Sequence, residues 1–153
     1  MMRFNILLRK KLLVAGTLLL LAGISIIIYF FTLTFDDSAT LKSDYSVEVI
    51  SFINEFSINE IASNKKYTEK IISLSGKITT LERVDTTVNI KFVDSLTGSY
   101  VICAFQQQHV GETKTLQSGD SVTIKGSCSG GIYSNILEVN TISFKRCLLE
   151  KKY

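Results

Sequence analysis

The sequence has 153 residues, enough for one ordinary domain and too few for two domains with a connecting segment. It contains 17 Lys and Arg against 14 Asp and Glu, for a formal charge of +3, and 46% of its residues are apolar. Positions 1–35 hold four basic residues and no acid, which leaves 13 basic and 14 acidic residues, a net charge of −1, in positions 36–153. This distribution disfavours a basic nucleic-acid-binding domain, and the composition excludes collagen-like, coiled-coil and wholly disordered chains.

The first predicted element is a transmembrane helix over residues 12–35. These 24 consecutive residues bear no charge and are mostly Leu, Ile and Phe. As a helix the run is about 36 Å long, enough to cross a hydrocarbon core of roughly 30 Å. A buried soluble helix is disfavoured, because the rest of the chain is too short to cover it on every side. A cleaved signal peptide is the main competitor, but its apolar region is normally about 7–15 residues and ends at a small-x-small site, which Thr32-Leu33-Thr34-Phe35 does not match.

The charges around this run predict its orientation. Arg9, Lys10 and Lys11 precede it, and Asp36 and Asp37 follow it. Because basic flanks stay in the cytoplasm, we expect a single-pass cell (inner) membrane protein with its C-terminal domain outside the cytoplasm. The expected organisation is a cytoplasmic stub (1–11), a transmembrane helix in contact with the lipid bilayer (12–35), a tether (36–45), a domain (46–147) and a tail (148–153).

Residues 46–67 are predicted to be helical. Ile53 and Phe56 follow Val49 or Ile50 at spacings of three and four, which is typical of a helix with one apolar face. The sequence Ser57-Ile58-Asn59-Glu60 is a capping-box pattern, so a second short helix or a new turn is expected to begin there.

After Lys70 the apolar residues recur at every second position, which predicts β-strands. Five strands are expected at 72–79, 88–92, 100–106, 122–128 and 136–144, with a hairpin loop at 94–99, a polar stretch at 107–117 and turns at 118–120 and 129–131. Five short strands with a break between the third and fourth favour a small antiparallel barrel of the OB type. The predicted fold class is therefore mainly β, a five-stranded OB-fold-like barrel preceded by one or two short helices and an N-terminal transmembrane helix. A five-stranded open meander covered by the 46–67 helices is the alternative.

Three segments of the chain resemble one known family. The helix end Asn59-Glu60-Ile61-Ala62, followed by Tyr67, Lys70 and Gly76, the run Val101-Ile102-Cys103-Ala104-Phe105, and residues 116–130 are similar in order and spacing to the tRNA_anti-like family of small bacterial envelope proteins. The resemblance covers roughly residues 49–144 and implies an OB-fold. The members are generally of unknown function, so the family label does not imply tRNA binding. The sequence departs from the family at Thr141, where a third Cys is frequent, and its own third Cys is Cys147 in the predicted tail.

The three cysteines leave several alternatives open. An extracytoplasmic domain meets oxidising conditions, so a disulfide between Cys103 and Cys128 is one alternative and a pairing with Cys147 is another. The third is that the cysteines are free and buried, where Cys behaves as a small apolar residue. The sequence has no CxxC, so it supports neither a thioredoxin-like redox site nor a Cys-based zinc site.

No cofactor is expected. The single His109 lacks partners for a zinc site or a catalytic triad and is expected to be a solvated loop residue. An N-terminal anchor before an OB barrel is also the architecture of the haem chaperone of cytochrome c maturation, but residues 143–153 contain no His for haem. The sequence has no Walker, Rossmann or nucleophile-elbow motif, so we expect no enzyme.

The OB-fold commonly binds ligands on the outer face of its second and third strands. If the alternating apolar residues point inward, the exposed set on these strands is Asn89, Lys91, Tyr100, Ile102 and Gln106. Nucleic acid is an unlikely partner, because one Tyr and one Lys do not make the stacking platforms and basic groove that it needs. We therefore expect an unknown protein, peptide or glycan ligand at Asn89, Lys91, Tyr100 and Ile102.

These observations predict a non-catalytic, membrane-anchored extracytoplasmic OB-fold binding module. The alternative is a structural subunit of an envelope membrane-protein complex, which docks through its transmembrane and juxtamembrane helices.

Overall fold

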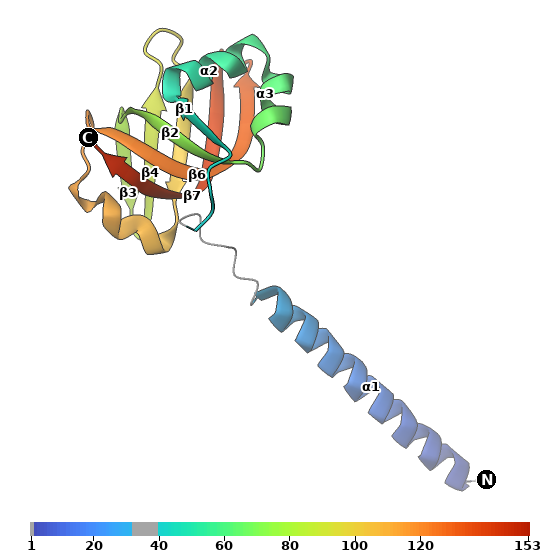
Figure 1. Ribbon diagram of the computed structural model, residues 1–153. Coiled ribbons are helices and arrows are strands. Elements are labelled where there is room, and N and C mark those ends of the chain that lie inside the picture. Colours follow the sequence, from blue (N-terminus) through green and yellow to red (C-terminus); the bar gives the residue numbers. More distant parts are fainter. Residues whose placement is uncertain (1, 32–39) are drawn as a thin grey trace. The chain divides into compact units, whose positions relative to one another are not determined.

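The computed structural model describes residues 2–31 and 40–153, and it describes no side chains for residues 2–10, 13, 30 and 31. The chain divides into two compact units, Met1–Phe35 and Asp36–Tyr153 (Figure 1). Residues 32–35 of the predicted transmembrane helix and residues 36–39 of the predicted tether lie outside the described residues.

The first unit is the helix α1 (Met2–Phe31). Its described apolar side chains are exposed all round, among them Leu12, Leu19 and Ile27. Within residues 2–31 and 40–153, no helix meets the combined requirement of length and apolarity for crossing a membrane.

The second unit is a curved sheet with two helices at one end (Figure 1). Its elements are β1 (Tyr45–Glu48), α2 (Val49–Ile58), α3 (Glu60–Tyr67), β2 (Ile71–Lys77), β3 (Thr80–Val84), β4 (Thr87–Val93), β5 (Tyr100–Phe105), the 3₁₀ helix η1 (Gln107–Thr115), β6 (Ser121–Ser134) and β7 (Val139–Lys152). The mainly β class and the helices before the sheet are confirmed. The capping-box pattern predicts Ser57 as the N-cap of the second helix, but the N-cap of α3 is Asn59, two residues later. The Asn59 side chain accepts a hydrogen bond from the Ala62 N–H.

The sheet has seven strands in the order β1-β2-β6-β7-β5-β4-β3 and is open, so the prediction of a five-stranded barrel is wrong in strand number and in the barrel itself. The predicted first strand, 72–79, corresponds to β2, which ends at Lys77; the strand β3 begins at Thr80, after Ile78 and Thr79, and was not predicted. The Ile78 N–H bonds the Asp120 carbonyl beside β6, and the Thr79 N–H bonds the Lys91 carbonyl of β4. Within these two residues the chain passes from β2, near one edge of the sheet, to β3, the strand at the other edge. In the described part of the chain, the two edges are not joined by strand pairing. The extra strand β1 pairs in parallel with β2.

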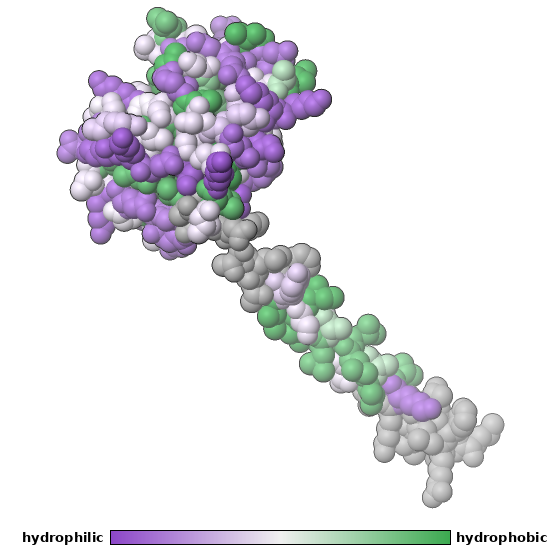
Figure 2. Space-filling view, viewed as in Figure 1, coloured by the Kyte–Doolittle hydropathy of each residue, from purple (hydrophilic) through white to green (hydrophobic). Residues whose placement is uncertain are grey.

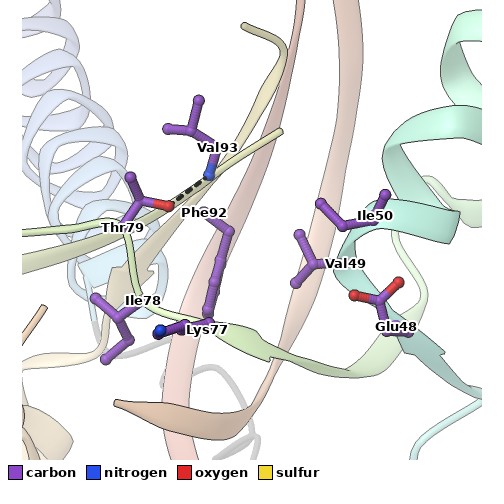
Figure 3. Close-up of a pocket in the computed structure, with 8 residues that line it drawn as sticks. All are labelled: Glu48, Val49, Ile50, Lys77, Ile78, Thr79, Phe92 and Val93. Carbon is purple, nitrogen blue, oxygen red and sulfur yellow. Dashed lines mark hydrogen bonds between the residues drawn. The ribbon is translucent and has the colours of Figure 1, made fainter. Parts of the chain in front are cut away.

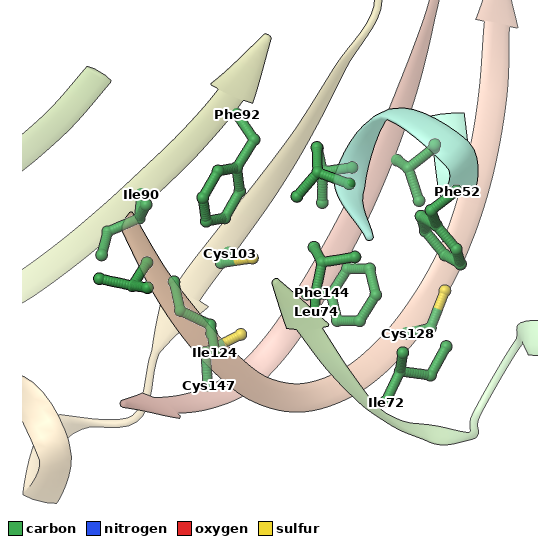
Figure 4. Close-up of a cluster of buried hydrophobic side chains, with 14 of the residues drawn as sticks. Phe52, Ile72, Leu74, Ile90, Phe92, Cys103, Ile124, Cys128, Phe144 and Cys147 are labelled. Atoms are coloured by element: carbon green, nitrogen blue, oxygen red, sulfur yellow. The ribbon is translucent and has the colours of Figure 1, made fainter. Parts of the chain in front are cut away.

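The strand alternation is confirmed in the hairpin β4–β5. The predicted inward residues are all buried: Val88, Ile90, Phe92, Val101, Cys103 and Phe105. They pack with β2, β6 and β7 into the core shown in Figure 4, and α2 adds Phe52, Ile53 and Phe56. This core fixes which side chains of β4 and β5 face outward.

Two boundaries near the C-terminus differ from the prediction. The predicted turn at 129–131 is a bulge inside β6, where Gly130 has φ +100° and the pairing with β7 shifts register. The predicted tail 148–153 is strand as far as Lys152, and Leu148 is buried. Both differences have the same cause, which is that β6 and β7 form one long hairpin. A bulge at Gly130, where Gly permits the left-handed backbone, lets the two strands pair on both sides of it.

Candidate binding surfaces

The predicted ligand residues lie together on the outer face of β4 and β5. Asn89, Lys91, Tyr100 and Ile102 are all half-buried. Lys91 is paired directly with Ile102 across the two strands. The Lys91 Nζ lies 4.9 Å from the centroid of the Tyr100 ring, a cation–π contact. The fold therefore brings these side chains together on one surface.

The same face continues across β7 to β6. In register, Tyr100 is opposite Thr141 and Ile102 is opposite Ser143. Residues opposite each other in a sheet point to the same side, so these hydroxyl side chains extend the surface. On β6 the partner of Ser143 is Gly130, which has no side chain. The surface ends there in a hollow of about 420 Å³, lined by Asn64, Ser129, Gly130, Gly131, Ile132, Thr141 and Ser143.

Asn64 of α3 forms one wall of this hollow. Its side-chain amide donates a hydrogen bond to the Gly131 carbonyl and accepts one from the Gly131 N–H, both at 2.8 Å. The helix end thereby satisfies backbone groups of β6 beside the bulge. This contact fixes the position of α3 against the sheet.

The charge on the outer face is small. Glu82 of β3 lies 3.8 Å from the Lys91 Nζ, and both side chains are partly exposed. Lys145, farther along β7, is paired with Glu69 at 2.9 Å. The hydrogen bond from Lys145 lowers the pKa of the Glu69 carboxyl, which favours its charged form. The outer face offers hydroxyl, amide and aromatic groups to a ligand and little net positive charge.

A second hollow lies at the corner between β2 and β3 (Figure 3). It has a volume of about 360 Å³, and Ile50, Ile78 and Phe92 contribute apolar groups to its lining. Its acid, Glu48, caps α2 by accepting a hydrogen bond from the Ser51 N–H. The corner is held by the bond from the Val93 N–H to the Thr79 hydroxyl. The groups of this hollow therefore have structural roles.

A third and larger hollow, of about 530 Å³, lies at the end of the domain where α2 meets α3. It is lined by Phe56, Ser57 and Glu60 of the helices, Thr97 and Ser99 of the β4–β5 loop, and Tyr133, Glu138 and Asn140 of the β6–β7 hairpin. None of these residues is among the predicted ligand residues. The sequence signal closest to this hollow is the apolar pair Ile136 and Leu137, which precedes the lining residue Glu138 in a turn, where polar residues are usual.

All three cysteines are buried and free. The alternative of a Cys103–Cys128 disulfide is wrong, because β7 lies between β5 and β6 and its Phe144 is the register partner of both cysteines. Two strand spacings are about 10 Å, beyond the roughly 7 Å that a disulfide spans between Cα atoms. Cys103 and Cys147 lie on neighbouring strands (Figure 4), and their thiols share a hydrogen bond.

His109 lies in η1 and is half-buried, where a solvated residue was expected. Its Nδ1 is 2.6 Å from Glu112 Oε1, while Glu112 Oε2 accepts a hydrogen bond from the Leu149 N–H. The pair thus ties η1 to β7. Over residues 2–31 and 40–153, no group of three His, Cys, Asp or Glu side chains is arranged to bind a metal ion.

The curved sheet, with its core on one face and the strands β4 and β5 exposed on the other, is an OB-like fold. The family model named tRNA_anti-like matches residues 6–141, and the chain belongs to this family. The resemblance found in the helix end and strands is thereby confirmed.

Two solved structures are similar to the chain. One is described as a "putative nucleic acid-binding lipoprotein" from Klebsiella pneumoniae subsp. pneumoniae; it is 16% identical, with a TM-score of 0.57 over 77% of this chain and 100% of that one. At this identity the likeness shows the fold alone. The other is described as a "putative aspartyl-tRNA synthetase" from Leishmania major Friedlin, 9% identical, with a TM-score of 0.45 over 78% of this chain and 23% of that one, which is too low to support an argument. No curated protein sequence is significantly similar to the chain.

Proposed function

We propose that the protein is a non-catalytic binding module, anchored in the cell membrane, whose OB-like domain binds an uncharged or weakly charged peptide or glycan outside the cytoplasm. The observation that supports this most directly is the outer face of the sheet. One row of register partners runs from Lys91 of β4 through Ile102 of β5 to Ser143 of β7. A second runs from Tyr100 of β5 to Thr141 of β7, and both rows end in the hollow beside Gly130. Aromatic, hydroxyl and amide groups around an open hollow suit a ligand with many hydrogen-bonding groups and apolar patches.

Nucleic acid is not the proposed ligand. Binding to a phosphate backbone requires several unpaired cations, whereas Lys91 has Glu82 beside it and Lys145 has Glu69. The charge of −1 on positions 36–153 supports the same conclusion.

The proposed site is tested by site-specific photo-crosslinking. A photoreactive amino acid at Ile102 in the full chain is expected to crosslink the ligand in intact cells, and the same group at the exposed Val84 of β3 is the control. Tyr100→Ala is expected to reduce capture at least about fivefold, because aromatic anchors commonly contribute more than about 1 kcal/mol. Equal capture from both positions, or no effect of Tyr100→Ala, contradicts the proposed face.

The membrane anchor is proposed from the sequence. Residues 12–35 have no charge, and the described part of α1 exposes its apolar side chains. We expect the full chain to stay in the membrane pellet after alkaline carbonate extraction, and a protease outside the cytoplasm to cleave the domain but not residues 1–11. Release by carbonate, or protection of the domain, contradicts the anchor or its orientation.

The second candidate is a structural subunit that docks through α1 and the neighbouring helices. Ile58 and Ile61 favour it, because they are 85% and 83% exposed where α2 meets α3. Replacing residues 12–35 by an unrelated span of the same length and orientation distinguishes the two. The binding module keeps its ligand, whereas the subunit loses its complex.

A further inference from the structure

The hollow where α2 meets α3 is formed by three segments that are distant in sequence. The α2–α3 junction contributes Phe56 and Glu60, the β4–β5 loop contributes Thr97, and the β6–β7 hairpin contributes Tyr133 and Glu138. The outer face of β4 and β5 plays no part in it. A ligand here therefore involves a different surface from the outer face that carries the first proposed function.

Buried polar groups fix the three segments to one another. The Asn140 side chain, 6% exposed, donates a hydrogen bond to the Ser57 hydroxyl, and the Asn140 N–H donates one to the Ser99 hydroxyl. Inside the β4–β5 loop, the buried Asp94 accepts hydrogen bonds from the Leu96 N–H and the Thr97 hydroxyl. The hollow is thus preformed, and a ligand would not bear the entropic cost of ordering it.

Large apolar side chains in the same three segments are almost fully exposed. Ile58 and Ile61 flank Glu60, Leu96 precedes Thr97, and Ile136 lies in the hairpin turn before Glu138; these four residues are between 83% and 93% exposed. Figure 2 shows hydrophobic surface at this end of the domain. Single exposed apolar residues are normal, but a set from three segments around one hollow is typical of an interaction site.

The charge at the hollow is negative and unpaired. The Glu60 Oε2 accepts a hydrogen bond from the Tyr133 N–H. Among the described residues, no cation forms an ion pair with Glu60 or Glu138. Two carboxylates beside apolar side chains repel anionic lipid headgroups and phosphates, and they attract Lys or Arg.

We propose that this end of the domain, defined by Ile58, Glu60, Ile61, Leu96, Ile136 and Glu138, is a docking site for a partner-protein segment that combines basic and apolar side chains. Apolar side chains of the segment fill the hollow and cover the exposed Ile and Leu residues. Its Lys or Arg side chains lie against the two carboxylates.

The test uses the full chain in uncharged detergent micelles and fluorescein-labelled short peptides, with empty micelles as the blank. Three peptides of equal length are compared by anisotropy: alternating Lys and Leu, alternating Glu and Leu, and alternating Lys and Ser. We expect the Lys–Leu peptide to bind at least about tenfold more tightly than either of the others. Equal binding of the Lys–Leu and Glu–Leu peptides overturns the charge argument, and equal binding of the Lys–Ser peptide overturns the apolar one.

Variants locate the binding. The pair Glu60→Gln with Glu138→Gln, and separately the pair Ile58→Ser with Ile136→Ser, are each expected to weaken Lys–Leu binding at least about fivefold. Val84→Ser removes an exposed apolar side chain from β3, is the matched control and is expected to bind as the wild type does. Lys91→Ala alters the outer face and locates any peptide that binds there. The proposal is overturned if Val84→Ser weakens binding as much as the Ile pair, or if neither pair weakens it. A loss in Lys91→Ala alone assigns the peptide to the outer face instead.

Discussion

Asn64 acts on β6 as a neighbouring strand would, because its amide pairs with both backbone groups of Gly131. Without it, the Gly131 N–H and carbonyl beside the bulge lose their partners. Removing one side of such bonds costs about 1–3 kcal/mol when the groups left behind are shielded from water. The stability of the domain therefore depends on the single side chain of Asn64, and its position in a short helix does not reveal this role in the sequence.

We therefore expect Asn64→Ala to lower the free energy of unfolding by about 1–3 kcal/mol. Asn64→Asp keeps the acceptor for the Gly131 N–H but loses the donor, so its loss should be smaller than that of the Ala variant. Urea unfolding followed by circular dichroism measures both. An unchanged unfolding midpoint in Asn64→Ala shows that these two bonds make no net contribution.

The cysteines are expected to be inert while the protein is folded. Burial raises the pKa of the Cys128 thiol to about 11, despite a hydrogen bond from the Gly130 N–H, and burial also raises the pKa of Cys147 well above its usual value. The reactive thiolate is therefore scarce at pH 8. Maleimide should label no thiol of the native protein and all three after denaturation in urea. Rapid labelling of the native protein, or fewer than three labels after denaturation, contradicts the free and buried state.

Helices α2 and α3 are joined by a group of three polar side chains. Glu55 accepts hydrogen bonds from the Lys66 Nζ and the Tyr67 hydroxyl, each at 2.9 Å. The bond from Lys66 is the largest cause of the lowered pKa of Glu55. A carboxyl with a lowered pKa in the folded state stabilises the fold above its unfolded pKa of roughly 4.3, and that contribution is lost as the pH falls through the lowered value.

We expect the wild type to lose more stability than Glu55→Gln between pH 6 and pH 3. The Gln variant cannot titrate, so its loss comes from the other carboxyl groups alone. Urea midpoints at a series of pH values measure the difference. Parallel pH profiles for the two proteins contradict a role for the Glu55 carboxylate.

The C-terminal half of β7 belongs to the folded domain. Leu148 is 6% exposed, whereas Leu96 in the β4–β5 loop is 92% exposed. Leu148→Ala removes buried methyl groups and should cost about 2–4 kcal/mol, while Leu96→Ala should change stability very little. Thermal or urea unfolding compares these two matched variants. Equal midpoints indicate that the end of β7 is a tail, as the sequence alone suggested.

Sequence patterns predicted the elements that depend on local information. Alternating burial in Val88, Ile90 and Phe92 follows from the residues themselves, and so does the hairpin loop at 94–99. The strands β1 and β3 were missed because they are short and lie at the two ends of the strand order: β1 alternates over only four residues, and β3 has no fully buried side chain. Their strand conformation depends on pairing with a neighbour that the local sequence does not reveal.

The candidate sites were predicted to different degrees. The face with Lys91 and Tyr100 follows from alternation on two adjacent strands. Its continuation over Thr141 and Ser143 depends on the parallel pairing of β5 with β7, which no local pattern indicates. The hollow at Glu60 and Glu138 requires three distant segments to meet, and only the tertiary fold brings them together.

For the molecule as a whole, the charge separates into +4 on residues 1–35 and −1 on residues 36–153. We therefore expect binding of the domain surface to a single-stranded oligonucleotide to be weaker than about 100 μM at physiological salt. Anisotropy titration of the full chain measures this, and Arg3, Arg9, Lys10 and Lys11 are replaced by Gln to remove the contribution of the N-terminus. Micromolar binding that persists in this variant and weakens steeply with salt contradicts the assignment of the outer face to a weakly charged ligand.

The two-residue corner at Ile78 and Thr79 also affects how the domain folds. Because the chain passes there from β2 to β3, the two halves of the sheet are joined, among the described residues, by ladder hydrogen bonds only where β5 pairs with β7. That pairing and the pairing of β2 with β6 join residues about 41 to 56 positions apart, and each requires a long loop to close before any bond forms. Folding should therefore take milliseconds to seconds, with the local hairpin of β4 and β5 formed first and the long-range ladders formed last.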